Sequence, residues 1–156
     1  MMSMQVREQA APFSLPEGPG QMVDVGAQFG EGPVVLLFFP LAFSPVCTEE
    51  FCTIRDDWSK WTDLDAKVFG ISIDSPFTVQ KFKETEGLPF PLLSDFNKEI
   101  AAKYGALHED LMGLKGVAKR AAFVVDRSGQ ISYAWVSEDP GKQIEFDEIL
   151  AAVRAS

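Results

Sequence analysis

An unbroken apolar run at residues 34–39, Val-Val-Leu-Leu-Phe-Phe, constrains the fold of this chain more than any other feature. It stands between Gly32-Pro33 and Pro40. A continuous apolar run of this length, bounded by turn residues, is typical of a strand that is buried on both faces. Such a strand belongs at the centre of a sheet, so we expect helices to cover both sides of it.

A helix is predicted directly after this strand. From residue 47 to residue 64, apolar residues recur at steps of three or four, which is the spacing of one helix face. They are Cys47, Phe51, Ile54, Trp58, Trp61 and Leu64. We therefore expect one helix over residues 45–64.

The rest of the chain alternates strand and helix patterns. Strands are expected at residues 67–73, 121–125 and 130–136, with a strand or loop at 92–95, and a hairpin turn at 126–129. Helices are expected at 76–87, at 98–104 and near the end of the chain, around Phe146, Ile149, Leu150 and Val153. This order predicts an α/β fold with a central mixed β-sheet and helices on both faces.

Length and composition favour a single domain over residues 1–156. The chain has 46% hydrophobic residues, enough to bury a core, and its Gly/Pro-dense stretch at residues 16–20 is typical of a turn rather than a linker. Its net charge of −9 disfavours binding to nucleic acid or to anionic lipid.

Targeting and metal signals are weak. The longest apolar stretch, residues 34–43, is interrupted by Pro40 and is too short to span a bilayer, and residues 1–8 lack the apolar region of a secretory signal. We therefore expect a cytoplasmic protein that does not bind membranes.

Two cysteines in a reducing compartment favour a catalytic or redox role. A single histidine, His108, leaves a zinc site short of ligands, so no metal is expected.

Cys47 has the sequence surroundings of a reactive thiol. If Ser44 is the N-cap of the helix, Pro45 is its first residue and Cys47 its third, the position where a capping box usually carries Glu or Gln. A thiolate there would accept hydrogen bonds from Ser44 and from free backbone N–H groups, and the helix dipole favours the charged form.

Nearby charges also bear on this thiolate. Glu49 and Glu50 oppose a negative sulfur, so a cation is needed, and Arg120, just before a predicted strand, is the candidate. From the residues alone, Arg120 is as well explained by a solvated surface charge. Arg55 is expected to pair on the surface with Asp56 or Glu50.

The segment around Cys47 resembles the peroxiredoxin family. The signature Pro-x-x-x-Thr/Ser-x-x-Cys is met by Pro40, Ser44 and Cys47, after the apolar strand and before the helix. The chain looks most like the bacterioferritin-comigratory (PrxQ) and AhpE-like branches, and the resemblance covers residues 11–135.

This resemblance implies a thioredoxin-like fold and a thiol peroxidase that reduces hydrogen peroxide and organic hydroperoxides. Cys47 would attack the peroxide and become a sulfenic acid, Ser44 would orient the oxygens, Arg120 would stabilise the charge, and Pro40 would shield the site. No cofactor is implied. The implied electron donor is thioredoxin or another thiol reductant, and relatives of this type include monomers and homodimers.

Cys52 is the candidate resolving cysteine, since the bacterioferritin-comigratory branch also uses a C-x4-C spacing. In an ideal helix the Cα atoms of residues i and i+5 are roughly 8 to 9 Å apart. A disulfide needs them within about 7 Å, so the helix would have to unwind before Cys47 and Cys52 could join. The alternative is that Cys52 is a buried bystander and that an external thiol resolves the sulfenic acid.

Two other functions compete with the peroxidase. A thiol-disulfide oxidoreductase works through C-x-x-C, and the longer spacing here argues against it. A non-enzymatic chaperone domain would use aromatic residues such as Phe43, Trp58 and Trp61, which we expect instead in the core or in a dimer contact.

Overall fold

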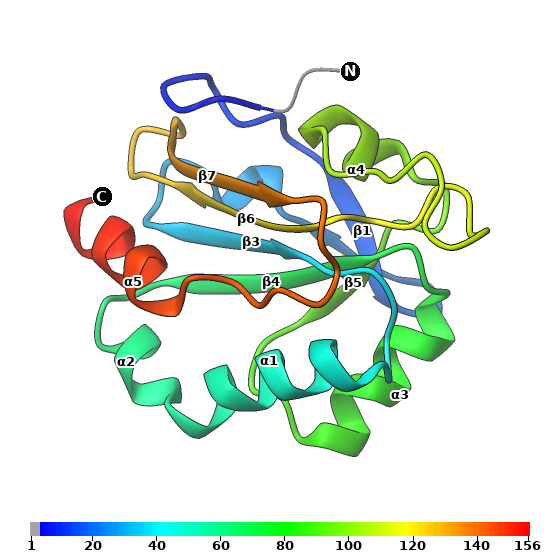
Figure 1. Ribbon diagram of the computed structural model, residues 1–156. Coiled ribbons are helices and arrows are strands. Elements are labelled where there is room, and N and C mark those ends of the chain that lie inside the picture. The colour runs from blue at the N-terminus through cyan, green and yellow to red at the C-terminus, as the bar shows by residue number, and fades with distance from the viewer. Residues whose placement is uncertain (1–3) are drawn as a thin grey trace.

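Five strands form one mixed sheet in the computed structural model, which describes residues 4–156. The first three residues of the N-terminal stretch discussed above lie outside the described part. The strand order is β5-β4-β3-β6-β7, which Figure 1 shows, with β3 in the centre as expected from its apolar run. The bounds are β3 Val34–Phe38, β4 Lys67–Ser72, β5 Leu92–Ser94, β6 Arg120–Val125 and β7 Ile131–Ser137. β3, β4 and β5 are parallel, β6 pairs antiparallel with β3, and β7 pairs antiparallel with β6, so the predicted mixed sheet is confirmed.

Alternate residues of β3 face two separate cores, because successive side chains of a strand point to opposite faces. Val35 and Leu37 belong to one core, and Val34, Leu36 and Phe38 to the other. All five side chains are fully buried. The expectation of a strand buried on both faces is therefore confirmed.

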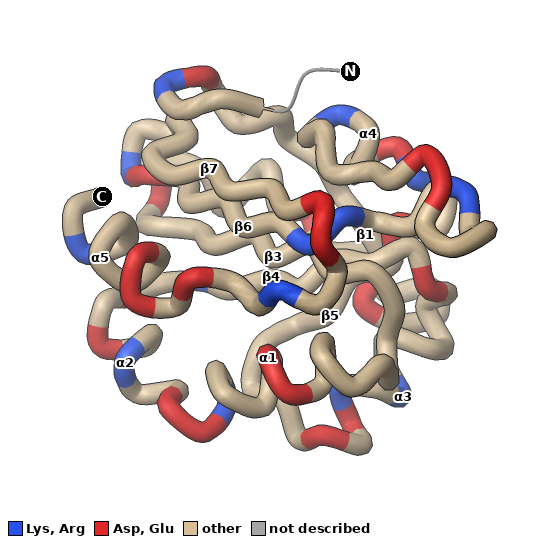
Figure 2. The backbone as a smooth tube through the Cα atoms, viewed as in Figure 1, with Lys and Arg blue, Asp and Glu red and all other residues tan. Residues whose placement is uncertain are grey.

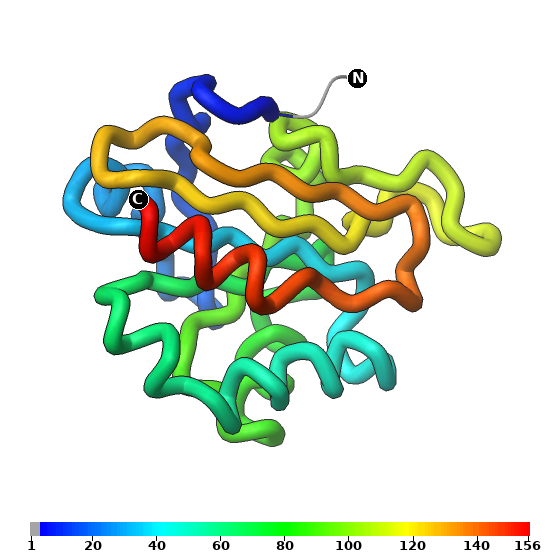
Figure 3. The backbone as a smooth tube through the Cα atoms, turned by 60° about the vertical axis from the view of Figure 1, so that its left-hand side comes forward, coloured from blue at the N-terminus to red at the C-terminus, as the bar shows by residue number. Residues whose placement is uncertain are grey.

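Helices supply the opposite wall of each core. The first core is closed by α1 (Pro45–Asp56), α2 (Trp58–Thr62), α3 (Pro76–Glu86) and α5 (Phe146–Ala155). The second core is closed by α4 (Glu99–Tyr104) together with β1 (Ser14–Gly18). Figure 3 shows α5 running alongside the sheet, where it contacts β6 and β7. Helices on both faces are thus confirmed.

The single helix expected over residues 45–64 is wrong. The chain leaves helical geometry at Asp57, with φ −111° and ψ 28°, so that α1 ends at Asp56 and the short α2 begins at Trp58. The apolar spacing continued across the break because both helices face the same core, where Ile54 and Trp61 are buried. Spacing alone does not detect one cap residue between two helices that share a face.

The N-terminal Gly/Pro-dense stretch is also more ordered than expected. Residues 16–18 belong to β1, which pairs antiparallel with β2 (Gln21–Asp24), and only Pro19 and Gly20 form the turn. A short 3-10 helix, η1 (Gly26–Gln28), follows. The two strands were missed because Pro16 and Gly18 are unfavourable strand residues, and a two-stranded ribbon at a sheet margin tolerates them.

Charged residues of both signs are scattered along the backbone. Figure 2 shows acidic positions on helices and loops with basic positions between them. Within residues 4–156, no helix is long and apolar enough to cross a bilayer.

Candidate active site

The loop from β3 to α1 is held in a tight turn that brings the start of α1 to the end of β3. The N–H of Phe39 donates to the Ile71 carbonyl at 2.9 Å, and the N–H of Ala42 donates to the Asp74 carboxylate at 2.8 Å. Phe43 has a φ of +68°, a conformation that costs energy for a residue with a side chain. These contacts fix the loop, so the residue that begins α1 is placed by both β3 and β4.

Ser44 is the N-cap of α1, as predicted, but its side chain does not cap the helix. Its hydroxyl donates to the Leu41 carbonyl at 2.8 Å, inside the same turn, so the expected hydrogen bond between Ser44 and Cys47 is wrong. The physical reason is that the tight turn places the Leu41 carbonyl within hydrogen-bond distance of the hydroxyl, which has only one hydrogen to donate. Because a hydroxyl has one hydrogen and two lone pairs, Ser44 remains free to accept a hydrogen bond from a bound molecule.

Cys47 lies next to Arg120, although 73 positions separate them in the sequence. The Nη2 of Arg120 donates to the Cys47 Sγ at 3.1 Å. Cys47 is fully buried and Arg120 is 1% exposed. Arg120 begins β6, whose partner β3 leads to Cys47, so the antiparallel pairing of these strands brings the two side chains together. The guanidinium is therefore placed where it can interact with negative charge on the sulfur.

The guanidinium of Arg120 is held by two further groups. Its Nη1 donates to the Glu50 carboxylate at 3.0 Å, and its Nη2 and Nε donate to the Pro140 carbonyl at 2.9 and 3.3 Å. Arg120 is therefore fixed from α1 on one side and from the segment after β7 on the other. A solvated surface role for Arg120 is wrong.

Glu50 binds the same guanidinium that contacts Cys47. It is fully buried, and its two oxygens bind Arg120 and the N–H of Ile144, the latter at 2.9 Å. Burial raises the pKa of Glu50, while the charge of Arg120 and the Ile144 hydrogen bond act to lower it. Its role could have been recognised from spacing, because residues i and i+3 share one face of a helix, which places Glu50 beside Cys47.

A pocket of about 270 Å³ opens beside these residues. Its walls are mostly apolar, and among the lining residues only Arg120 carries a charge. The lining residues are Pro40, Leu41, Ser44, Pro45, Val46, Leu111, Met112, Arg120, Pro140 and Gly141. Three of the candidate residues, Pro40, Ser44 and Arg120, thus meet at one pocket, and Cys47, which does not line it, contacts the lining residue Arg120. The loop residues Leu111 and Met112 and the segment at Pro140 were not anticipated.

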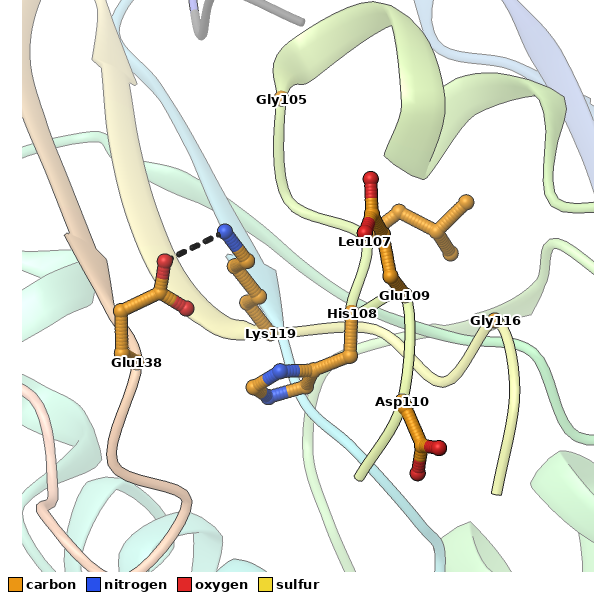
Figure 4. A pocket seen from close by; sticks show the side chains of 8 residues that line it. All are labelled: Gly105, Leu107, His108, Glu109, Asp110, Gly116, Lys119 and Glu138. Atoms are coloured by element: carbon orange, nitrogen blue, oxygen red, sulfur yellow. Dashed lines mark hydrogen bonds and ion pairs between the residues drawn. The ribbon is translucent and has the colours of Figure 1, made fainter. Parts of the chain in front are cut away.

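A second hollow, of about 750 Å³, lies beside the residue that precedes Arg120 (Figure 4). In it, Lys119 forms an ion pair with Glu138 at 2.8 Å. The imidazole of His108 is 6% exposed, and its Nε2 has no hydrogen-bond partner among the described residues. Burial lowers the pKa of His108. The ion pair ties the start of β6 to the segment that carries Pro140, so it supports the position of Arg120.

Cys52 is half-buried on α1 and belongs to neither core. Its Sγ donates to the Glu86 carboxylate at 3.4 Å. Burial raises the pKa of the Cys52 thiol, the Glu86 hydrogen bond raises it further, and the charge of Arg55 opposes both. The idea that Cys52 is a fully buried core residue is therefore wrong, because Cys52 sits at the margin between α1 and α3.

Arg55 lies on the outer side of the same region. It pairs with Asp56 at 3.0 Å, as predicted, and its Nη1 donates to the Glu86 carbonyl at 2.6 Å. The alternative pairing with Glu50 is wrong, since Glu50 points into the protein. Both cysteines are free thiols within one continuous helix, α1, so ideal helix geometry keeps their Cα atoms roughly 8 to 9 Å apart.

Comparisons with known proteins show which family the chain belongs to. Residues 6–134 match the AhpC/TSA family. The Coxiella burnetii protein bcp is 37% identical over 86% of this chain and 89% of its own length. Alkyl hydroperoxide reductase E of Mycobacterium tuberculosis is 35% identical over 94% of this chain and 95% of its own.

Solved structures extend the agreement to the backbone. The crystal structure of peroxidoxin BcpB from Mycobacterium tuberculosis has a TM-score of 0.85 and 34% identity, covering 97% of each chain. The expected thioredoxin-like fold is thereby confirmed. The chain therefore belongs to the AhpC/TSA family and is a peroxiredoxin, a thiol-dependent peroxidase.

Proposed function

We propose that Cys47 is the peroxidatic cysteine and that Arg120, Ser44 and Pro40 form its site. The observation that carries this proposal is the 3.1 Å contact between Arg120 Nη2 and Cys47 Sγ, together with the apolar pocket that Arg120, Ser44 and Pro40 line. A thiolate is the reactive form of cysteine, and a fixed guanidinium stabilises negative charge both on the sulfur and on the departing oxygen.

In the first step, the Cys47 thiolate attacks one oxygen of the peroxide. The O–O bond breaks, the sulfur becomes a sulfenic acid, and the second oxygen leaves and takes up a proton to form water or an alcohol. Ser44 accepts a hydrogen bond from the peroxide, and Arg120 donates to the oxygen on which charge develops. Pro40 forms part of the wall that limits water around the sulfur.

In the second step, Cys52 resolves the sulfenic acid as an intramolecular disulfide. Its thiolate attacks the Cys47 sulfur, the S–O bond breaks and water leaves. Because both cysteines lie in one helix, α1 must unwind between them first. The half-buried position of Cys52 supports this role over that of a core residue. The alternative is a one-Cys cycle in which an external thiol reduces Cys47.

Thioredoxin or a similar thiol donor would then reduce the disulfide, which is the recycling expected of this family. We further propose that residues 1–156 act as one domain, as a monomer or homodimer, in a reducing compartment such as the cytoplasm. The two free cysteines support a protein that works where thiols are kept reduced.

Intact-mass analysis after one equivalent of hydrogen peroxide tests this cycle. We expect a mass lower by two hydrogens, with Cys47 joined to Cys52 in the peptide map and a loss of helical signal in circular dichroism. A stable gain of one oxygen on Cys47 would support the one-Cys alternative, and oxidation of neither cysteine would contradict the proposed site.

A further inference from the structure

We propose that Glu50 is a positioning residue that holds α1 folded between the two cysteines, and that its release sets the rate of disulfide formation. This inference rests on the proposed two-cysteine cycle. Glu50 follows Cys47 by three positions and precedes Cys52 by two, so it lies on the stretch of helix that must unwind.

Glu50 is tied to two parts of the protein outside α1. One carboxylate oxygen accepts from Arg120 at the start of β6, and the other accepts from the N–H of Ile144, in the segment after β7. Both contacts are buried. Unwinding between the cysteines moves the Glu50 backbone and withdraws its carboxylate from both partners.

The other residues between the cysteines hold the helix less specifically. Glu49 is exposed, and the Thr48 hydroxyl and N–H donate to the carbonyl of Ser44, the N-cap of the same helix. Phe51 is buried in the core and packs against the rings of Phe39 and Phe90. Glu50 is therefore the residue in this stretch that links helix folding to the group contacting the sulfur.

Oxidation of Cys47 changes the group that the Arg120 Nη2 contacts, but it leaves the Glu50 carboxylate and its contacts with Arg120 and Ile144 in place. Glu50 then remains as the anionic partner of Arg120. The ion pair thus keeps α1 folded after the peroxide has reacted, and delays the approach of Cys52. A slow approach also leaves the sulfenic acid open to a second peroxide, which would oxidise it to sulfinic acid.

The resolving step itself balances without an added reagent. The Cys52 sulfur attacks the Cys47 sulfenic sulfur, forming the S–S bond and breaking the S–O bond. Hydroxide leaves and takes the proton from the Cys52 thiol, giving water. The Cys47 sulfur is formally reduced by one and the Cys52 sulfur is oxidised by one, so that both reach the disulfide level without an external oxidant or reductant.

Single-turnover kinetics on the full chain test the proposal. The protein is mixed with one equivalent of hydrogen peroxide, quenched over time, and the Cys47 sulfenic acid and the Cys47–Cys52 disulfide are measured separately by mass spectrometry. In Glu50→Gln, the oxygen that accepts from Ile144 is kept and the charge facing Arg120 is lost. We expect disulfide formation about tenfold faster than in the parent, with slower sulfenic acid formation, since a hydrogen bond to a charged group is removed.

Two variants of the exposed neighbour Glu49 serve as controls. Glu49→Gln makes the same charge change without touching the buried ion pair, and we expect both rates within twofold of the parent. Glu49→Gly weakens the helix in general, since glycine is a poor helix former, and we expect less acceleration than in Glu50→Gln. An equal acceleration in Glu49→Gly would overturn the proposal, because helix stability alone would then explain it.

The remaining outcomes are also decisive. If Glu50→Gln does not fold, Glu50→Asp is used instead. It keeps the negative charge on a side chain that is shorter by one methylene, which weakens the contacts with Arg120 and Ile144, and it should also accelerate disulfide formation. An unchanged rate of disulfide formation in the variant that folds overturns the proposal. A parent protein that forms sulfenic acid but no disulfide also overturns it.

Absence of sulfenic acid from Cys47 in the parent is a distinct result that contradicts the proposed function itself. At excess peroxide, the faster variant should accumulate less sulfinic acid than the parent.

Discussion

The Nη2 of Arg120 lies 3.1 Å from the Sγ of Cys47, and the opposite side of the same guanidinium is fixed by the buried Glu50 carboxylate. The cation cannot swing away from the sulfur without breaking an ion pair between two side chains that are each at most 1% exposed. Arg120 is thus positioned before any peroxide binds, which is the condition under which a fixed charge contributes most to catalysis.

Substitution of this arginine should slow the peroxide step. In Arg120→Lys, the positive charge is kept, but the fork that binds Glu50, Pro140 and Cys47 together is lost. We expect the second-order rate constant with peroxide to fall by about 100-fold, the order seen when one preorganised donor is removed. Circular dichroism provides the control, since an unfolded variant would lose helical signal. A rate constant within threefold of that of the parent would show that Arg120 takes no part in the reaction with peroxide.

The peroxidase activity should depend on the hydroxyl group of Ser44 more than on the size of this side chain. Ser44→Ala removes the group that faces the pocket and bonds to Leu41, and we expect kcat/KM for hydrogen peroxide to fall by about tenfold, corresponding to about 1.4 kcal/mol for a net hydrogen bond. Ser44→Thr keeps the hydroxyl and should retain more than half of the activity. Equal activity in the two variants would mean that the hydroxyl does not contact the peroxide.

The Glu86 carboxylate should suppress the reactivity of Cys52. Burial and the hydrogen bond to Glu86 raise the pKa of the Cys52 thiol, so Glu86→Gln should bring that pKa down and increase the thiolate fraction at neutral pH. The measurement is the rate of iodoacetamide alkylation of Cys52 as a function of pH, in a Cys47→Ser background. A matched control is Glu84→Gln, which changes a charge on the same helix, and a profile identical in all three proteins would disprove the effect.

The fold should lose stability in mild acid because of His108. Burial lowers the pKa of His108 below its usual 6.5, and the facing charges of Glu138 and Lys119 act in opposite directions on it. A group whose folded pKa is depressed binds fewer protons in the folded state, so its contribution to stability is present above pH 6.5 and is lost as the pH falls below that value. Urea unfolding at pH 7.5 and pH 5.5 measures the loss, and His108→Gln should lose less stability between the two pH values than the parent. An equal loss in both proteins would exclude His108 as the cause.

The sequence predicted the parts of this protein that depend on periodicity and on a local motif. The apolar run at residues 34–39 identified the central strand, and the motif around Cys47 identified Pro40 and Ser44 as neighbours in one loop. Helix bounds were less accurate at Asp57, because two helices that share a buried face continue one apolar spacing.

The long-range part of the site was harder to predict. Arg120 was named as a candidate because a cation was needed near Cys47, and the family resemblance was needed to prefer it over a solvated surface charge. The ion pair between Glu50 and Arg120 was not predicted, because the two residues lie 70 positions apart in the sequence. The contact with the Pro140 carbonyl could not be predicted at all, because every residue has a backbone carbonyl and the residue type does not indicate which one accepts a hydrogen bond.

The reaction of Cys47 with peroxide tests the central claim most directly. In stopped-flow measurements of peroxide consumption, the parent protein should react rapidly, and Cys52→Ser should carry out the first turnover at the rate of the parent. Cys47→Ser should show no reaction above that of buffer, since Cys52 is held by Glu86 and lies away from the Arg120 guanidinium. Rapid peroxide consumption by Cys47→Ser would contradict the account.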